Sequence, residues 1–263
     1  MKIGIIGVGV VGKAIKNGFE NSHEIFLHDP KLGTELRNVT DNTDFSYIAV
    51  PTPSNPETGE CDISIIESIL DQMPDGQRII IKSTVIPGST KYLQEKYPRL
   101  IIGCSPEFLR SATSKDDFKN QDLLVVGTDD EELAEEVFKH HLEAGVMRKK
   151  QFFHVTPTQA ELVKYAKNSF YAMKVIFANQ FHDLAKTLGE EWRDVKEIIT
   201  TDQEQVIGPS HLNSPEGGNR GFSGECLPKD TLALKFQLEK MEIKYNLIQA
   251  IIDDNKILKG ENN

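Results

Sequence analysis

The sequence has few cysteines and no long apolar run, and both absences exclude whole classes of protein. Its three cysteines, Cys61, Cys104 and Cys226, are an odd number without the spacing of a metal site. They argue against a disulfide framework, predict no bound metal and favour a reducing compartment, so we expect a cytoplasmic protein. No apolar stretch approaches the length of a membrane span, and the N-terminus has no secretory cleavage site. We therefore expect no membrane partner.

Positive charge is also scarce. The chain carries 30 lysines and arginines against 40 aspartates and glutamates, which gives a net charge of -10 at pH 7. This charge repels nucleic-acid backbones, and no basic run overrides it, so we expect no nucleic-acid partner. A length of 263 residues with 38% hydrophobic content instead predicts a soluble globular protein of two domains.

The hydrophobic pattern changes near residue 156. Before this point, short β-branched runs alternate with amphipathic stretches, which predicts an α/β domain over residues 1–156, with a Rossmann-type parallel sheet and crossover helices. Residues 157–263 have helical periodicity and predict an all-α domain. The predicted strands are Lys2–Ile6, Glu24–His28, Tyr47–Val50, Arg78–Lys82, Leu100–Cys104, Leu123–Val126 and Phe152–Val155.

One long helix is predicted to begin at Pro157 and to stop at Gly189. A helix of this length spans about 45 Å, which is longer than a small domain is wide. We therefore expect it to link the domains and to pack against a second subunit in a homodimer. Its recurring apolar positions are Leu162, Ala166, Phe170, Met173, Phe177, Phe181, Leu184 and Leu188. Further helices are predicted over Trp192–Thr200, Thr231–Lys240 and Tyr245–Leu258.

A glycine pattern near the N-terminus predicts a dinucleotide site. Gly7 suits a tight turn, Gly9 lets a pyrophosphate approach the backbone, and Gly12 permits close packing of helix on sheet. Asp29 ends the second predicted strand, where a carboxylate binds ribose hydroxyls and repels a 2′-phosphate, so NAD is expected rather than NADP. Lys31 is close enough to weaken that preference, although a solvated turn lysine is the simpler interpretation. The cofactor positions in this region are Gly7, Gly9, Val10, Val11, Gly12, Asp29 and Lys31.

Several further motifs, in their order and spacing, resemble those of the UDP-glucose/GDP-mannose 6-dehydrogenase family. The matching segments are Gly7–Gly12, Val50–Pro53, Lys82–Val85, Pro106–Arg110, Glu161–Lys164 with Asn168, and Gly224–Asp230. The resemblance implies that a nucleotide-sugar C6 alcohol is oxidised through an aldehyde to a carboxylate while two NAD molecules are reduced. UDP-glucose is the first candidate substrate, and GDP-mannose or a related hexose is the second.

Cys226 is the predicted nucleophile. A thiolate can add to an aldehyde and, after loss of a second hydride, leave a thioester that water hydrolyses. Cys226 lies in a glycine-rich loop just before a predicted helix start, where amide donors and Lys229 favour a thiolate. Cys104, inside a predicted strand, is interpreted as a buried core residue.

Lys164 and Asn168 are four residues apart and share one face of the long helix, away from its apolar positions. The resemblance implies that they hold the reacting oxygen and a catalytic water. It makes Asp230 the residue that positions or deprotonates this water, and Asp230 also suits the first turn of a helix. Lys167 and Lys174 are expected on a solvated face.

The remaining candidates follow from strand ends and from the same resemblance. Glu107 is implied as the base for thioester hydrolysis, and Thr84 is implied to assist the same water or the nicotinamide. Pro51, Thr52 and Pro53 are expected to line the cofactor. The additional substrate contacts are expected from Phe108, Leu109, Arg110, Arg220, Gly221 and Phe222.

The chain departs from the family pattern at three points. Glu225 places a negative charge beside the nucleophile, which opposes thiolate formation unless the side chain points away. Val206 stands where the family has an arginine that reaches substrate across the dimer, and Arg220 is the candidate substitute. The family also continues into a domain that binds the nucleotide, so we expect this chain alone to bind NAD normally and to turn over UDP-glucose poorly unless those contacts are supplied.

Two other functions remain open. A 3-hydroxyacid dehydrogenase also combines a Rossmann domain with a long helix carrying a lysine, but it needs no cysteine such as Cys226. A regulatory or assembly subunit that binds NAD without catalysis is the second alternative. The presence of Lys164, Asn168, Cys226 and Asp230 argues against it.

Overall fold

The computed structural model describes residues 1–55, 57–110, 113–201, 208, 210–212, 220–243 and 246–261, with the side chain of Lys150 left out. The chain forms two compact units. The first comprises Met1–Pro53 and Cys61–Lys164, and the second comprises Ser54–Glu60 and Tyr165–Asn263. The boundary between them lies inside the long helix, whereas the sequence pattern placed it at residue 156.

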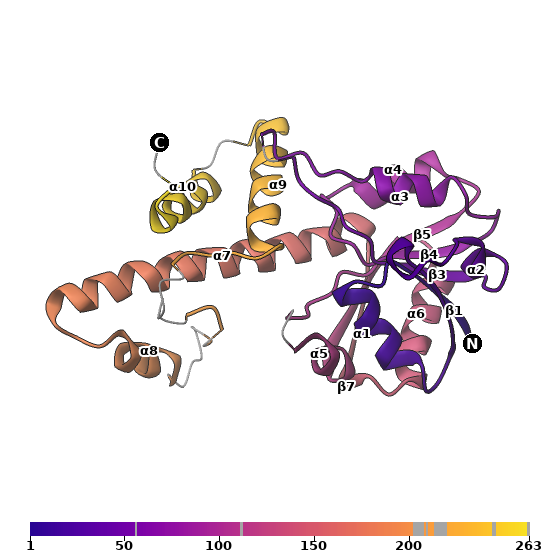
Figure 1. The fold of residues 1–263 in the computed structure, drawn as a ribbon, viewed down its shortest axis with the longest axis horizontal. Helices are drawn as coiled ribbons and strands as arrows, with labels where there is room; N and C mark the ends of the chain where they lie inside the picture. The colour runs from indigo at the N-terminus through magenta and orange to yellow at the C-terminus, as the bar shows by residue number, and fades with distance from the viewer. Residues whose placement is uncertain are drawn as a thin grey trace. The chain divides into compact units, whose positions relative to one another are not determined.

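The first unit is built on one sheet, drawn on the right of Figure 1. Its seven described strands are in the order β2-β1-β3-β4-β5-β6-β7. Its buried strands are rich in isoleucine, a β-branched residue that packs well on a pleated surface. Ile3, Ile5, Ile79 and Ile80 are fully buried. The strands are β1 (Lys2–Ile6), β2 (Glu24–His28), β3 (Phe45–Ile48), β4 (Arg78–Ile81), β5 (Ile101–Cys104), β6 (Gln121–Gly127) and β7 (Met147–Val155).

The sheet is not wholly parallel, which corrects the sequence-based expectation. β1 to β5 run parallel, but β6 pairs with β5 in the antiparallel sense at Cys104 and Gly127, and β7 is parallel to β6. Between β5 and β6 lies the six-residue helix α5 (Ser114–Lys119), which packs against α1 (Val10–Phe19) through Phe118 and Gly18. The chain therefore enters β6 from the other end of the sheet. An apolar run reveals a strand but not its direction.

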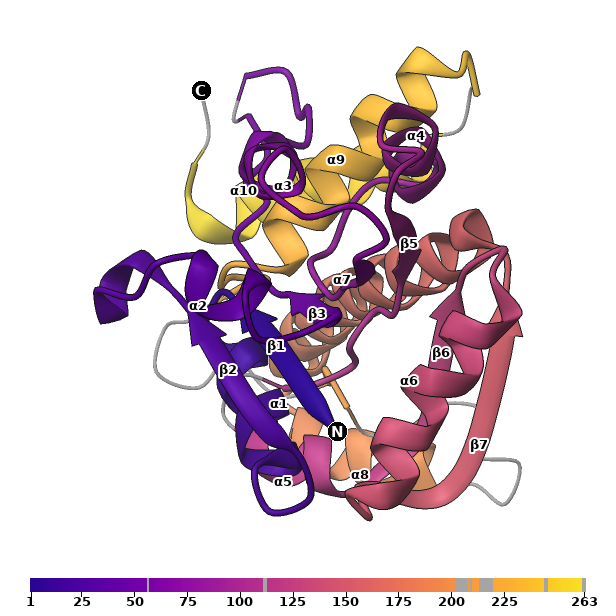
Figure 2. The same ribbon diagram turned by 90° about the vertical axis from the view of Figure 1, so that its right-hand side faces the viewer.

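Helices cover both faces of this sheet, as Figure 2 shows. On one face α3 and α4 pack on β1, β3 and β4 through Ile66, Leu70 and Leu93. On the other face α1, α5 and α6 enclose a second core with Phe19, Phe118 and Val137. The helices not yet bounded are α2 (Arg37–Thr40), α3 (Ser64–Leu70), α4 (Ser89–Lys96) and α6 (Glu131–Glu143), with a 3-10 turn at Pro30–Leu32.

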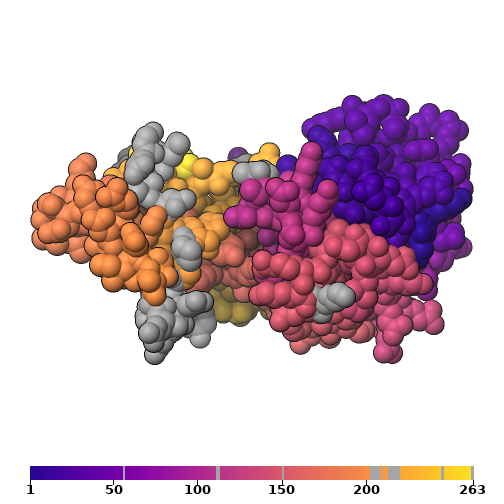
Figure 3. All heavy atoms as spheres, turned by 90° about the horizontal axis from the view of Figure 1, so that it is seen from below, coloured from indigo at the N-terminus to yellow at the C-terminus, as the bar shows by residue number. Residues whose placement is uncertain are grey.

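The second unit is helical, as predicted. The described helices are α7 (Pro157–Leu188), α8 (Trp192–Thr201), α9 (Leu227–Lys240) and α10 (Leu247–Lys259). α7 begins at Pro157 and ends before Gly189, whose φ is +77°. Two small cores hold this unit, one around Ile176, Phe222 and Ile251, and one around Trp192 and Leu212. α8 lies on the surface of the unit (orange in Figure 3). Among the described residues, no helix combines the length and apolar character needed to cross a membrane.

The apolar positions of α7 are largely exposed in the single chain. The exposed fraction is 49% for Leu162, 52% for Phe170, 42% for Phe181, 52% for Leu184 and 68% for Leu188. The buried positions of the helix carry both polar residues, such as Lys164 and Asn168, and apolar residues, such as Ala172 and Ile176. α7 therefore exposes large apolar side chains while it buries charged and polar ones, which an ordinary surface helix does not do.

Candidate functional site

The glycine turn between β1 and α1 has the geometry of a phosphate-binding loop. Gly7 has a φ of +87°, and a Cβ at this position would lie 2.5 Å from the Ala49 carbonyl oxygen. A Cβ on Gly12 would lie 1.9 Å from the Gly7 carbonyl oxygen, so both glycines are required by packing within the protein. Gly9 differs, because a Cβ there would meet no described atom within 4 Å. The N-terminus of α1 behind Gly9 is exposed and has no side-chain cap, which fits a pyrophosphate.

Asp29 lies at the end of β2 and holds this loop. Its Oδ2 accepts a hydrogen bond from the Val8 amide at 2.7 Å, and its Oδ1 accepts one from the Lys31 amide at 2.8 Å. These bonds, the one from Val8 foremost, keep the pKa of Asp29 below its usual range. Each carboxylate oxygen can accept a further bond, so Asp29 can both hold the loop and bind a ribose hydroxyl. Lys31 is exposed and takes part here through its backbone.

The ends of β3 and β4 are tied to each other. The Thr52 hydroxyl donates to the Thr84 carbonyl oxygen at 2.7 Å, and the Ser83 hydroxyl donates to the Val50 carbonyl oxygen at 2.7 Å. The Thr52 side chain is thus used for holding Thr84, while Pro51 and Pro53 on either side are exposed. The structure brings together the strand ends that the sequence assigned to the cofactor.

Glu107 and Lys164 form a largely buried pair within the first unit. The Lys164 ammonium donates to Glu107 Oε1 at 3.0 Å and to the Glu107 carbonyl oxygen at 2.8 Å. The second carboxylate oxygen accepts the Leu109 amide at 2.5 Å. Lys164 also lies 5.9 Å from the centre of the Phe108 ring. The site therefore presents a cation and a carboxylate whose positions are fixed by each other.

Arg110, predicted to contact substrate, is bound to another partner. Its guanidinium donates to both carboxylate oxygens of Asp117, at 3.1 and 2.7 Å. This pairing lowers the pKa of Asp117 to about 2. The Arg110 side chain remains 71% exposed, so the pair does not remove it from solvent.

Lys82, part of a family-like motif, has contacts that the sequence did not reveal. It follows β4, is 3% exposed, and its ammonium donates to the Ser105 hydroxyl at 3.1 Å. Burial lowers its pKa to about 8, and Glu107 opposes that shift. Cys104, next to Ser105, is also buried, and burial raises the pKa of its thiol to about 12. This places Cys104 in the core, in keeping with its interpretation from the sequence.

Glu161, part of a family-like motif, has a local structural function. Its carboxylate accepts the amides of Gly88 at 2.6 Å and Thr90 at 2.8 Å. It thereby satisfies donors at the start of α4, on the segment that follows Thr84. Glu161 is 3% exposed, and burial raises its pKa.

Cys226 lies at the start of α9, in the second unit. It is exposed and occupies the N-cap position, and its carbonyl oxygen accepts the Asp230 amide at 2.8 Å. The predicted helix start at Thr231 is therefore four residues late, because Pro228 at the N-terminal turn begins the helix earlier. Backbone amides at a helix N-terminus can in general stabilise a thiolate.

Asp230 and Asn168 are brought together beneath this turn. The Asn168 amide donates to Asp230 Oδ2 at 2.5 Å, and the Lys229 ammonium donates to Asp230 Oδ1 at 2.7 Å. Asp230 is 1% exposed and Asn168 is 6% exposed. Lys229, which the sequence suggested as a neighbour of the thiol, therefore has Asp230 as its ion-pair partner. Lys164 and Asn168 each bind a different carboxylate.

The segment before Cys226 is held by helices of the same unit. Arg220 pairs with Asp183 on α7, and Phe222 is 3% exposed in the core, so its side chain is a packing group. Lys174 corrects an expectation: it is not on a solvated face but 7% exposed, with its ammonium bonded to the Gly208 carbonyl oxygen. Val206 lies outside the described residues.

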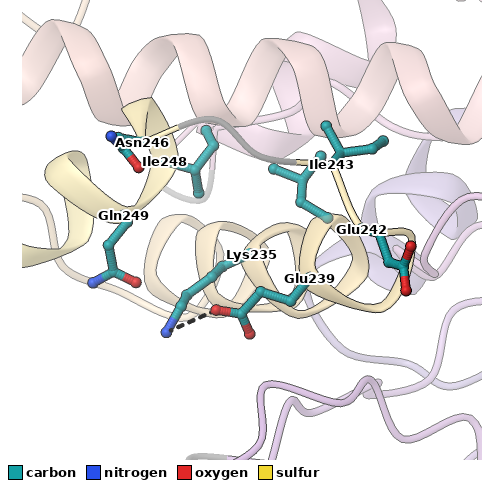
Figure 4. A pocket seen from close by; sticks show the side chains of 8 residues that line it. Lys235, Glu239, Glu242, Ile243, Asn246, Ile248 and Gln249 are labelled. Carbon is teal, nitrogen blue, oxygen red and sulfur yellow. Dashed lines mark ion pairs between the residues drawn. The ribbon is translucent and has the colours of Figure 1, made fainter.

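A cavity of about 550 Å³ lies between α9 and α10. Leu238, Ile243 and Ile248 supply its apolar wall, and Lys235 pairs with Glu239 at its edge (Figure 4). Among the described residues, none of the candidate catalytic side chains lines it. It is therefore no part of the candidate site.

Comparison with known proteins gives two matches to one family. Residues 27–142 match the NAD binding domain, and residues 158–257 match the central domain, of the UDP-glucose/GDP-mannose dehydrogenase family. A UDP-glucose 6-dehydrogenase of Rickettsia typhi is 34% identical over 230 residues, which are 83% of this chain and 50% of the relative. The chain spans about half the length of the curated relatives it matches.

Comparison with solved structures finds dehydrogenases of similar fold. A UDP-glucose dehydrogenase from the archaeon Pyrobaculum islandicum superposes with a TM-score of 0.83 at 27% identity, covering 97% of this chain and 68% of that one. A 3-hydroxyisobutyrate dehydrogenase of Mycobacterium tuberculosis superposes with a TM-score of 0.70 at 15% identity, over 96% and 91% of the two chains. The second likeness concerns the fold alone.

The burial of Lys82 generates a prediction about stability. Its pKa is about 8 in the fold and 10.5 for an ordinary lysine, so between these values the unfolded chain binds more protons and stability rises with pH. The full cost of burying the charge is present below pH 8. Lys82→Met should therefore stabilise the protein more at pH 7 than at pH 10.5, by roughly 3 kcal/mol. Urea unfolding of both proteins across this range measures the difference. The control is Lys91→Met, an exposed lysine on α4, and a stability difference independent of pH would contradict the prediction.

Proposed function

The chain belongs to the UDP-glucose/GDP-mannose dehydrogenase family, and we propose that it oxidises the C6 alcohol of a nucleotide sugar to the carboxylate, with UDP-glucose as the first candidate. The observation that carries the proposal is the position of Cys226. It is an exposed thiol at the N-cap of α9. Asp230, in the turn that follows, is buried and bonded to Asn168 of α7. A thiol in this position fits the reducing cytoplasm expected from the sequence.

In the proposed reaction Cys226 is the covalent nucleophile. Its thiolate adds to the aldehyde formed from the C6 alcohol and gives a thiohemiacetal, which the second oxidation converts into a thioester. NAD, when bound, accepts the hydride of each oxidation. Water then hydrolyses the thioester and releases the carboxylate and the thiol.

The Lys164–Glu107 pair supports charge and proton transfer in this scheme. A lysine ammonium stabilises the negative charge that develops on the reacting oxygen in the transition state. This stabilisation lowers the activation free energy of the reaction. Glu107 is the proposed base for the hydrolytic water, and the bonds from Lys164 and Leu109 fix its carboxylate. In the second unit, Asp230, held by Asn168 and Lys229, is proposed to orient or deprotonate a catalytic water.

The thiol mechanism is tested by NADH yield. We expect the protein to form two NADH per molecule of UDP-glucose at millimolar substrate, and Cys226→Ala to lose nearly all acid formation because no thioester can form. NADH absorbance and mass spectrometry of the sugar product measure both. Cys104→Ala is the control, because a buried core thiol should affect stability alone.

Other outcomes separate the alternatives. Two NADH per product from the Cys226→Ala protein would rule out covalent catalysis by this residue. A single NADH from a 3-hydroxyacid, unaffected by the substitution, would identify the 3-hydroxyacid class. NAD binding without NADH formation from a panel of UDP and GDP sugars would point to the regulatory subunit.

The cofactor preference is tested at Asp29. Asp29→Asn keeps an oxygen that can accept the Val8 amide and removes the charge that repels a 2′-phosphate. We expect the unmodified protein to bind NAD at least tenfold more tightly than NADP, and the variant to narrow that ratio. Dissociation constants for both cofactors, measured by calorimetry, provide the test. Equal affinities in the unmodified protein would refute the assignment.

We also propose that two copies associate through the exposed apolar face of α7. Phe170 and Leu184 are each 52% exposed and lie on the same face as Leu188, and contiguous apolar surface of this kind marks an interface. Leu184→Glu should therefore convert a dimer into a monomer, as measured by light scattering. Lys186→Glu, a charge change at an exposed position of the same helix, is the control. A monomeric unmodified protein would exclude this interface.

A further inference from the structure

Asn255, on α10, makes two hydrogen bonds to the backbone of the segment that leads to Cys226. Its Oδ1 accepts the Phe222 amide at 2.7 Å, and its Nδ2 donates to the Phe222 carbonyl oxygen at 3.2 Å. Asn255 is 9% exposed, and both bonds are buried. The side-chain amide of Asn255 thus satisfies both the backbone N–H and the backbone C=O of Phe222.

The surroundings of Phe222 reinforce this contact. Gly221 has a φ of +72°, and a Cβ there would lie 2.4 Å from Asn255 Oδ1, so glycine is required for Asn255 to approach. The Gly221 amide is also directed at Asn179 Oδ1, at 3.4 Å. The Phe222 ring packs against Ile176 and Ile251. The chain is therefore fixed at residue 222.

Beyond Phe222 the chain is exposed for four residues, including Cys226 itself. The next fixed point is the first turn of α9, where Asp230 binds Asn168 and the Asp230 amide bonds the Cys226 carbonyl oxygen. The exposed thiol segment is thus held at both ends, by Asn255 at one end and by Asn168 at the other.

We infer that Asn255 is a positioning residue for Cys226: its two bonds to Phe222 fix the start of the segment and so limit the positions that the thiol occupies at the end of α9. This inference rests on the proposed function for its kinetic consequence. Its structural consequence does not depend on any substrate.

The test compares Asn255→Asp with Asp254→Asn. The first variant keeps an acceptor for the Phe222 amide but loses the donor and sets a carboxylate oxygen against the Phe222 carbonyl. The second changes the adjacent residue of the same helix, which bonds Gln180 at 3.0 Å. Alkylation by iodoacetamide at pH 7.5, followed at Cys226 by mass spectrometry, reports on the thiol in the absence of substrate. Cys61 and Cys104 are buried and provide internal references.

We expect Asn255→Asp to slow alkylation of Cys226 at least threefold, because a released segment spends less time where the helix amides stabilise the thiolate. We also expect kcat with UDP-glucose to fall by about tenfold or more while KM for NAD is unchanged. Asp254→Asn should change neither. Gly221→Ala changes no residue of α10, but its methyl group would displace Asn255 Oδ1. It should reproduce both effects if Asn255→Asp folds poorly.

Alkylation of Cys226 at the rate of the Asp254→Asn protein, in both Asn255→Asp and Gly221→Ala, would overturn the inference. So would an unchanged kcat in an active enzyme whose alkylation had slowed. If alkylation slows but the unmodified protein oxidises no nucleotide sugar, the proposed function fails while the placement of the thiol by Asn255 stands.

Discussion

The long helix α7 buries polar side chains, and a buried polar group has to find a partner within the protein. The partners lie in loops and in the first turns of α4 and α9. The bonds run from Glu161 to Gly88 and Thr90, from Lys164 to Glu107, from Asn168 to Asp230, from Lys174 to Gly208 and from Asn179 to Gly221. The helix therefore fixes the conformation of the candidate chemical groups, separately in each unit. Some of its apolar residues, such as Ile176, enter the cores of the second unit, and others, such as Phe170 and Leu184, stay exposed in the single chain.

The burial of polar residues on α7 explains part of what could and could not be predicted from the sequence. Periodicity predicted the bounds of α7 and the shared face of Lys164 and Asn168, because both follow from the helical repeat. It did not reveal that Lys174 is buried, because a repeat shows which residues share a face but not which face is covered. The contacts of Lys82 and Asn255 could not be predicted for a related reason. Their partners, Ser105 and Phe222, are 23 and 33 residues away in the sequence.

The cofactor loop was predicted more completely, because its constraints are local. Gly7 and Gly12 are required by backbone atoms of the same turn, and Gly9 is open. The structure adds that Asp29 bonds the Val8 amide. A single carboxylate thus shapes the loop, and the same carboxylate is the proposed source of the preference for NAD. In the sheet, by contrast, the direction of β6 depends on where the preceding segment packs. The apolar pattern of Leu123–Val126 does not indicate that direction.

The division of the chain bears on the order in which the protein is assembled. Ser54–Glu60 interrupts the first unit but belongs to the second, and the Ser54 hydroxyl donates to the Lys229 carbonyl oxygen across 175 residues of sequence. Gly59 approaches the Leu232 backbone, where a Cβ would lie 2.8 Å from the carbonyl oxygen. During synthesis this short segment emerges long before α9, so we expect it to pair only after α9 has been made. We therefore expect closure of this long loop to be a late step of folding.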